Sequence, residues 1–393
     1  FHYYLCRQLK GGGMEIFMGQ KRKAVVAGHL CVDLTPIFPE ECRGELAKIM
    51  LPGKLTNVRG IHVYAGGVVV NTGITMSKLG VDVKLMGKLG KDAFGRMAAE
   101  IIHQYGLDQD LIWDGNTDTS YTIALAVPGQ DRTFLHSPGA NDTFRYEDLN
   151  MEEIGKADLF HFGYPPLMKN MFINDGEELV KIFRHVYEAG VITSLDMAGV
   201  DPLAPAGKAD WEKILEHVMP YTDIFVPSAE ELLYMLDKKK LEQLSEKAGG
   251  RDLTEILNVD YDVKPLGDIL IEMGAKIVLI KCGAAGIYYR TAEKRKIQAV
   301  EEKLGLSLKG WEQQEGFEKS YIPERVASGT GAGDAAIAGF LTGFLKGASL
   351  NECVQYAAAE GACCVEAYDA LGGIRTLEEI REKIEKGWKK QNI

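Results

Sequence analysis

A glycine-rich turn and the apolar run behind it occupy residues 327–341, which read ASGTGAGDAAIAGFL. Three glycines in five positions, from Gly329 to Gly333, allow positive φ angles and a close approach of the backbone to a ligand. The alanine-rich run that follows predicts a buried helix. The N-terminus of such a helix carries free amides and the positive end of the dipole, so it favours an anion. The stretch therefore predicts a phosphate-binding helix N-terminus.

Asp334 lies in the first turn of this predicted helix. A carboxylate beside a phosphate site would repel a resting phosphate, which makes Asp334 a candidate base that takes a proton from an attacking hydroxyl. The amides of Gly331, Ala332 and Gly333 are the candidate anion hole. The alternative is that Asp334 is simply one of the acids that helices favour in their first turn. The motif alone leaves both interpretations open.

Length and composition restrict the class of protein. The 393 residues and 46% hydrophobic content suit one large α/β domain or two ordinary ones. The formal net charge of -11 disfavours nucleic acid or an anionic membrane as partner, since both need a positive surface. The seven cysteines form no Cys-x-x-Cys pair, which predicts reduced thiols. No apolar run reaches the roughly 18 residues of a membrane span, and we expect a cytoplasmic protein.

The N-terminal part of the chain contains an unpatterned segment and then a strand. Residues 1–23 show no clear period and do not begin with Met, so we interpret them as an extension or a start artefact. Residues 24–28, AVVAG, predict a strand that ends in glycine, and Asp33 follows it. Ligands bind at the carboxyl edge of a parallel sheet, where Asp33 is expected to lie. The alternative for Asp33 is an ordinary turn residue.

A second glycine turn opens a helix at residues 64–80, YAGGVVVNTGITMSKLG. Gly66 and Gly67 form the turn, the apolar spacing that follows suits burial, and Gly80 is placed to end the helix. We expect the amides of this turn and the side chain of Asn71 to face the same cleft as Asp33.

The rest of the chain predicts an α/β architecture. From residue 151 onward strand and helix patterns alternate, which predicts a doubly wound, mostly parallel sheet flanked by helices. Residues 119–127 and 132–136 flank a Pro-Gly turn and predict a hairpin. Two charged segments, 236–264 and 292–324, are expected to be surface insertions made of solvated loops.

Four segments, taken in chain order, resemble the ribokinase-like (PfkB) carbohydrate kinases. Residues 65–80 resemble the first family signature, and residues 328–340 resemble the second, whose usual form is Asp-Thr-Thr-Gly-Ala-Gly-Asp. MGKLGKDAFG at 86–95 is similar to the family's Gly-x-x-Gly-x-Asp-x-x-Gly segment, and PGAN at 138–141 to its Gly-Ala-Asn turn. The resemblance implies one ribokinase-like kinase domain over residues 24–393. It also implies a small β lid over the sugar site, built from strands within about 30–62 and 112–137, through which related kinases often dimerise.

The resemblance implies roles for individual residues on the acceptor side. Asp334 would be the catalytic base, with the amides of residues 331–333 as the anion hole. The residues that match the sugar-binding positions are Asp33, Gly66, Gly67, Asn71 and Asn141. Val68 to Val70 follow the glycine pair where ribokinases place a lysine, which weakens ribose as the substrate.

On the nucleotide side, residues 277–286, IVLIKCGAAG, are similar to the family's ATP-binding strand and loop. The implied nucleotide-binding residues are Ser228, Lys281, Gly283, Gly286 and Thr330. Residues 223–231 resemble an Asn-x-x-Glu segment in which Ser228 replaces Asn and Glu231 matches the acid that organises Mg²⁺ through water. The alternative for Glu231 is a surface helix acid. Ser328 and Gly329 replace the Asp-Thr that supports a monovalent cation in many relatives, which argues against potassium activation.

The sequence as a whole predicts an ATP- and Mg²⁺-dependent kinase that transfers the γ-phosphate to a hydroxyl of a small sugar or sugar acid, similar to a fructokinase or a ketodeoxygluconate kinase. An adenosine-type nucleoside kinase is the first alternative, because Phe38, Tyr121 and Phe134 could form an apolar wall beside a base. A sugar-binding regulator without turnover is the second, motivated by Ser228 and Ser328. An oxidoreductase is disfavoured because no Gly-x-Gly-x-x-Gly opens the first helix.

Overall fold

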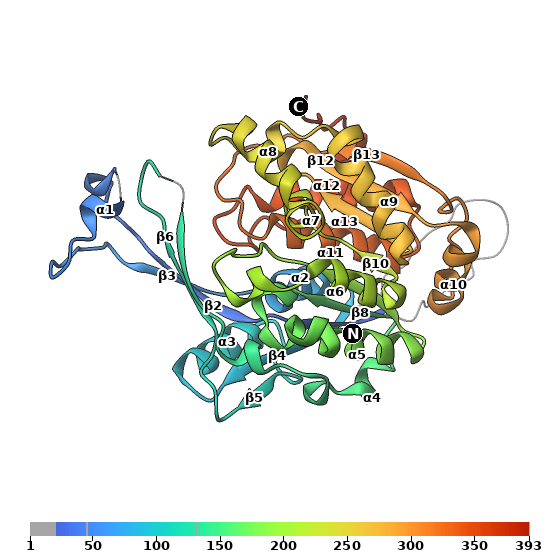
Figure 1. The fold of residues 1–393 in the computed structure, drawn as a ribbon, viewed down its shortest axis with the longest axis horizontal. Helices are drawn as coiled ribbons and strands as arrows, with labels where there is room; N and C mark the ends of the chain where they lie inside the picture. The colour runs from blue at the N-terminus through green and yellow to red at the C-terminus, as the bar shows by residue number, and fades with distance from the viewer. Residues whose placement is uncertain (1–20, 45, 131, 393) are drawn as a thin grey trace.

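The structure is a computed structural model that describes residues 21–44, 46–130 and 132–392. The prediction for residues 1–23 therefore falls almost entirely outside the described residues. A nine-stranded sheet runs through the body of the molecule, with helices on both faces (Figure 1). Its strands, in spatial order, are β13 (Glu315–Lys319), β12 (Gly286–Thr291), β11 (Ile277–Lys281), β10 (Ile224–Phe225), β9 (Ile192–Asp196), β8 (Leu159–Gly163), β1 (Lys23–Gly28), β4 (Asp82–Gly90) and β5 (Ile112–Asp114).

The strands from β5 to β11 run parallel, and β12 and β13 are added antiparallel at one edge. The predicted doubly wound, mostly parallel sheet is therefore confirmed. Alternate residues of β1 enter two different cores, with Ala24 and Val26 on one face and Val25 and Ala27 on the other. This alternation follows from the period of two in a strand that is buried on both faces.

Each face of the sheet is covered by its own set of helices (Figure 1). One core includes apolar residues of α2 (Val68–Lys78), α3 (Ala93–His103), α10 (Lys294–Leu304), α11 (Ala332–Leu345), α12 (Leu350–Cys364) and α13 (Leu377–Glu385). The other includes residues of α4 (Met151–Ile154), α5 (Glu177–Glu188), α6 (Trp211–Val218), α7 (Ala229–Leu236), α8 (Lys238–Ala248) and α9 (Lys264–Met273). None of the helices in the described ranges combines the length and the apolar character that a membrane crossing requires.

A second, smaller sheet extends from one side of the body, at the left of Figure 1. Its order is β3 (Ile61–Gly66), β2 (Cys31–Pro36), β6 (Tyr121–Leu125) and β7 (Thr133–Ser137), and the short α1 (Leu46–Ile49) lies at its tip. Strands from the two expected regions thus form the small sheet. The second predicted lid range, 112–137, began too early, because its first residues form β5, which pairs with β4 in the main sheet.

The expectation that residues 236–264 and 292–324 are solvated loops is wrong. The first segment contains α8, whose Leu244 and Ala248 are buried in the core. The second contains α10 and the edge strand β13, and its Trp311 is buried against Phe340 and Phe344 of α11. Charged residues on the outer faces of amphipathic elements produced the loop-like composition.

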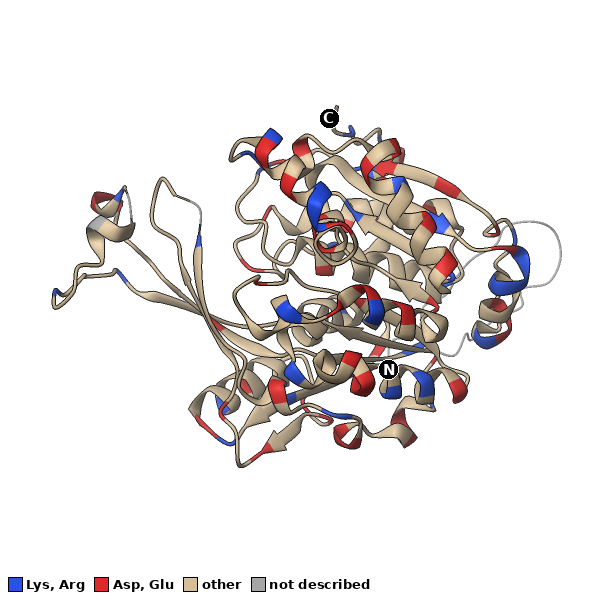
Figure 2. Ribbon diagram, viewed as in Figure 1, with Lys and Arg blue, Asp and Glu red and all other residues tan. Residues whose placement is uncertain are grey.

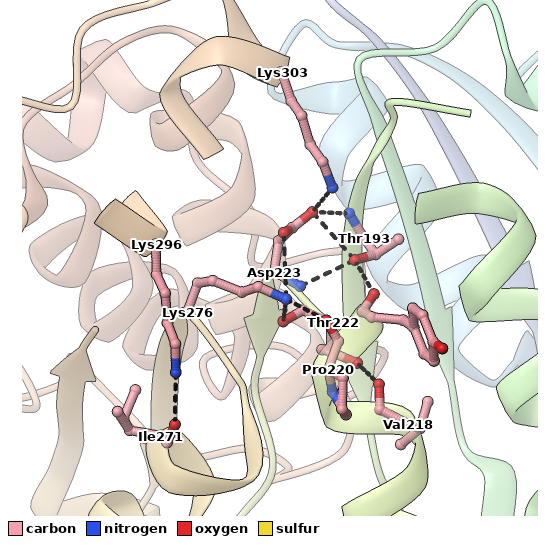
Figure 3. Close-up of polar contacts among 10 residues, drawn as sticks. Thr193, Val218, Pro220, Thr222, Asp223, Ile271, Lys276, Lys296 and Lys303 are labelled. Atoms are coloured by element: carbon pink, nitrogen blue, oxygen red, sulfur yellow. Dashed lines mark hydrogen bonds and ion pairs between the residues drawn. The ribbon is translucent and has the colours of Figure 1, made fainter. Parts of the chain in front are cut away.

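A buried ionic cluster holds α10 against the amino-terminal edge of the sheet (Figure 3). Asp223, just before β10, is 1% exposed and accepts hydrogen bonds from the amide and the hydroxyl of Thr193 at 3.0 and 3.2 Å. Lys303 of α10 reaches the same carboxylate at 2.8 Å, and Lys276 lies 3.9 Å from its other oxygen. Burial lowers the pKa of Lys276 to about 8, although Asp223 opposes this change.

Substitution of Asp223 by Ala should destabilise the protein by about 3–5 kcal/mol, because it leaves two buried ammonium groups without their counter-charge. Glu382 of α13 is the matched control, since its ion pair with Lys386 at 3.1 Å is exposed, and Glu382→Ala should cost less than about 1 kcal/mol. Urea unfolding of both variants measures the two free energies. Equal losses would show that the cluster does not fix α10.

Candidate active site

The carboxylate of Asp334 lies at the point where two buried helices meet. It belongs to the first turn of α11, and only 5% of the residue is exposed. Asn71 of α2 donates a hydrogen bond to its Oδ2 at 3.0 Å, and Thr72 donates one to its Oδ1 at 3.2 Å. A buried carboxylate requires such partners, so α2 and α11 fix the position of Asp334 together.

Glycines at the start of α2 and of α11 allow these two helices to approach each other closely. Gly331 caps α11 with φ 77°, and a Cβ atom there would lie 2.3 Å from the Cβ of Ala370. Gly67 caps α2 with φ 86°, and a Cβ atom on Gly66 would lie 2.1 Å from Oδ2 of Asp33. Only glycine suits these positions. The turn before α2 therefore brings Asp33 to the end of the helix that carries Asn71.

Asp33, Gly66, Gly67 and Asn71, predicted from separate parts of the sequence, thus lie on the same side of Asp334. Burial raises the pKa of Asp33, and the negative charge of Asp334 raises it further. Hydrogen bonding by Cys31 and Thr122 opposes this rise. Asp33 lies against Gly66 in the turn before α2, and Asp334 is bound by Asn71 of the same helix. An acceptor held by Asp33 and Asn71 would present its hydroxyls towards Asp334.

The structure corrects the expectation for Asn141. This residue is fully buried, its Oδ1 accepts from the amide of Leu30 at 3.2 Å, and its Nδ2 donates to the carbonyl of the same residue at 3.0 Å. Both polar atoms of the side chain thus hold the turn between β1 and β2. Asn141 positions the backbone next to Asp33 and does not present its amide to a ligand.

Ala332 and Gly333, which directly precede Asp334, line a cavity of about 470 Å³. Of the residues predicted to bind the nucleotide or its phosphates, Lys281, Gly283, Gly286, Ala332 and Gly333 line it. The first amides of a helix have no intrahelical acceptor, so the start of α11 offers them to this cavity. The volume is in the range of small-molecule and cofactor sites.

Ser228, Glu231 and Thr330 lie outside the lining of this cavity. Ser228 caps α7, where its amide donates to Oε2 of Glu231 at 2.7 Å and its hydroxyl accepts from the amide of Glu231 at 3.3 Å. This capping box uses one oxygen of Glu231 and leaves the other available. The hydroxyl of Thr330 accepts a hydrogen bond from Arg132 of the small sheet at 2.6 Å.

Two side chains that sequence analysis did not single out also reach the site. Asp196, the last residue of β9, accepts a hydrogen bond from Nζ of Lys281 at 2.7 Å. Burial raises the pKa of Asp196, and Lys281 opposes this change. Tyr164, just after β8, donates its hydroxyl to both oxygens of Asp334, at 2.6 and 2.7 Å. An acid directly after a buried strand is a signal that could have identified Asp196, whereas no sequence pattern marks Tyr164.

No group of three or more His, Cys, Asp or Glu side chains within the described residues is arranged to hold a metal ion. Mg²⁺ keeps several waters and is often bound by one or two carboxylates together with substrate phosphates. The free oxygen of Glu231 fits a site of that kind.

The protein is similar in sequence to sugar kinases. An uncharacterized sugar kinase of Archaeoglobus fulgidus is 25% identical over 299 residues, which cover 76% of this chain and 97% of that protein. Fructokinase-1 of Oryza sativa subsp. japonica is 26% identical over 330 residues, which cover 81% of this chain and 88% of the relative.

Solved structures share the fold. A ribokinase of Arabidopsis thaliana in complex with ribose and ATP matches with a TM-score of 0.67 at 20% identity, covering 92% of this chain and 98% of that one. A fructokinase of Xylella fastidiosa with bound ATP matches with the same TM-score and identity over 93% and 99% of the two chains. Residues 21–377 match the pfkB family carbohydrate kinase profile. Together with the two glycine turns that meet at Asp334, this match assigns the chain to the pfkB family of carbohydrate kinases.

Proposed function

We propose that this protein transfers the γ-phosphate of ATP to a hydroxyl of a small neutral sugar, with fructose as the first candidate. The observation that carries the proposal is the position of Asp334, whose carboxylate is bound by Asn71 and whose chain neighbour Gly333 lines a cavity together with Lys281. A base between an alcohol site and a phosphate site is the arrangement that phosphoryl transfer needs.

In the proposed reaction Asp334 takes the proton of the acceptor hydroxyl. The hydroxyl oxygen attacks the γ-phosphorus of ATP, and the bond between the γ-phosphorus and ADP breaks. The amides of Gly331, Ala332 and Gly333 stabilise the charge on the moving phosphoryl group. Lys281 lies beside them, since a Cβ atom on Gly333 would be 3.8 Å from its Nζ. Bound Mg²⁺ would neutralise charge on the nucleotide phosphates, with Glu231 as the proposed acid that orders its waters.

Charge on the acceptor side favours a neutral sugar over a sugar acid. Asp33 and Asp334 both face the acceptor, and the ammonium group of Lys281 is bound to Asp196. Burial lowers the pKa of the neighbouring His29 to about 3, with a further contribution from His136, so His29 is neutral at physiological pH. A carboxylate on the acceptor would thus meet two acids.

A nucleoside is the second candidate acceptor, and a specific cavity supports it. Thr122 and His136, which hydrogen bond to each other at 3.0 Å, line a cavity of about 680 Å³ together with Phe134 and Phe172. Thr122 pairs with Asp33 across strands β2 and β6, so a base attached to the acceptor could extend into this cavity. Tyr121, in contrast, packs against Phe94 with ring centroids 5.5 Å apart.

Replacement of Asp334 by Asn should lower kcat by about 10²–10⁴-fold, because it removes the base, and should leave ATP affinity nearly unchanged. Calorimetric titration of ATP and a coupled ADP assay measure the two quantities. Asp260→Asn is the control, because Asp260 is exposed and lines neither of the two cavities described above. A wild-type protein that binds sugar and forms no ADP would instead support a regulator without turnover.

A panel of fructose, ribose, 2-keto-3-deoxygluconate and adenosine should rank fructose first in kcat/KM. We expect kcat/KM for the sugar acid to be lower than for fructose by at least about tenfold, or 1.4 kcal/mol, because Asp33 and Asp334 repel its carboxylate. The ADP assay with each acceptor at varied concentration provides the ranking. Preference for adenosine would select the nucleoside alternative, and preference for the acid would contradict the charge argument.

We further propose that the small sheet joins two copies of the chain. Large apolar side chains are exposed along it and near its tip, namely Met50, Leu51, Leu55, Val58, Ile61, Phe134 and Leu135. Several exposed apolar residues on one extension of a protein are typical of an interaction site.

If this proposal is correct, light scattering will give the mass of a dimer for the wild type and of a monomer for Leu135→Glu, because a charge opposes burial of the shared face. Tyr261→Glu is the matched control, since Tyr261 is 76% exposed and lies just before α9, which packs against the main sheet. A monomeric wild type, or equal dissociation by both variants, would contradict the proposed interface.

A further inference from the structure

The hydroxyl of Tyr164 lies where a reacting alcohol would be expected on Asp334. Its oxygen is 2.6 Å from Oδ1 and 2.7 Å from Oδ2, so its single proton is shared between both carboxylate oxygens. Oδ2 also accepts from Asn71 and Oδ1 from Thr72. Three donors thus surround the two oxygens of the proposed base, and the Tyr164 hydroxyl lies against both oxygens, where a further hydroxyl has to replace it.

Of these donors, Tyr164 is the one that can be exchanged. Asn71 and Thr72 belong to the buried helix α2, whose packing against α11 fixes them. Tyr164 instead follows the end of β8 and reaches Asp334 through a single long side chain that is partly exposed. Rotation of that side chain would free the carboxylate without moving a helix.

The backbone of Tyr164 is held in an unfavourable conformation. Its φ and ψ angles are 69° and 44°, in the left-handed region, and Pro165 and Pro166 follow it. A bulky residue rarely adopts this conformation, and a residue before proline is restricted further. Such strain persists where the surrounding structure maintains it, and it is concentrated at functional sites.

We propose that, without an acceptor, the Tyr164 hydroxyl takes the place of the acceptor alcohol on Asp334 and prevents this base from activating water. The inference rests on the proposed role of Asp334. Water at that position would lose a proton to Asp334 while its oxygen bonds to the γ-phosphorus and the bond to ADP breaks, giving phosphate and ADP. Acceptor binding displaces the Tyr164 hydroxyl, so the base becomes available when a sugar is present.

Two properties of the surroundings support this role. Burial raises the pKa of Tyr164, and the charges of Asp334 and Asp196 raise it further, so its oxygen keeps its proton and remains a donor. His29 lies beside the Tyr164 ring, with ring centroids 5.7 Å apart. It is 2% exposed, and within the described ranges neither of its ring nitrogens has a hydrogen-bond partner. Once the sugar has displaced the Tyr164 hydroxyl from Asp334, a ring nitrogen of His29 can thus accept a hydrogen bond from it.

The test is the rate of ATP hydrolysis by the full-length Tyr164→Phe protein without any acceptor. Loss of the hydroxyl leaves the two oxygens of Asp334 open to water, and we expect hydrolysis to rise by about tenfold or more. Addition of Asp334→Asn to the same chain should abolish the increase. A merely structural role of Tyr164 would not produce hydrolysis that depends on Asp334.

Tyr288→Phe is the matched control, because Tyr288 is 1% exposed in the core and its hydroxyl has no partner among the described residues. Its hydrolysis rate should equal that of the wild type. Thermal unfolding monitors the fold of each variant, and Tyr164→Leu replaces Tyr164→Phe if the latter does not fold. A folded Tyr164 variant whose hydrolysis is unchanged or reduced overturns the proposal, as does an increase that survives Asp334→Asn.

A failure of the proposed function and a failure of the role proposed for Tyr164 would give different experimental results. If no sugar or nucleoside in the panel is phosphorylated, the choice of acceptor is wrong, while the comparison of hydrolysis by wild type and Tyr164→Phe still tests the inference. If sugar transfer is normal and hydrolysis is the same in both proteins, the kinase proposal stands and the role of Tyr164 is refuted.

Discussion

The burial of one carboxylate at the junction of two helices is the constraint on which the site depends. Asp334 is almost completely removed from water and remains tolerable there because α2 supplies an amide and a hydroxyl to its oxygens. Glycine at the start of each helix is needed for this approach, since a Cβ atom on Gly66 or Gly331 would collide with a neighbour. The turn before α11 also brings Ala332 and Gly333 to the lining of the cavity that contains Lys281. The packing of α2 against α11 in the core therefore also fixes the position of the proposed anion site at the start of α11.

This dependence explains what sequence could predict. The two glycine turns, Asp33, Asn71 and Asp334 follow local rules of turns and helix ends, and the structure brings them together. The parallel sheet was predictable because its strands are apolar runs that alternate with amphipathic helices. The resemblance to a known family supplied the order in which these pieces assemble, and the profile match over residues 21–377 agrees with it.

The failures have a common physical origin. Asn141 was expected to face a ligand, but its amide satisfies the backbone of Leu30, a partner more than one hundred residues away in the chain. The segment around Trp311 looked like a loop because its charges outnumber the few apolar residues that anchor it. Tyr164 carries no local signal at all, since its importance arises from a contact with a helix that begins 168 residues later. Long-range polar pairing of this kind cannot be read from periodicity.

The division of the site between the two halves of the chain has a consequence for biosynthesis. The groups on the acceptor side, from His29 to Tyr164, belong to the first half, whereas Lys281, Gly286 and Asp334 come from the second. One of the two cores contains residues from Ala24 to Ile380, so it stays open until the last helices have left the ribosome. A nascent chain can therefore assemble the strands around Asp33 before it contains Lys281 or Asp334. The junction of α2 and α11 around Asp334 is therefore enclosed by a finished core only after Ile380 has left the ribosome.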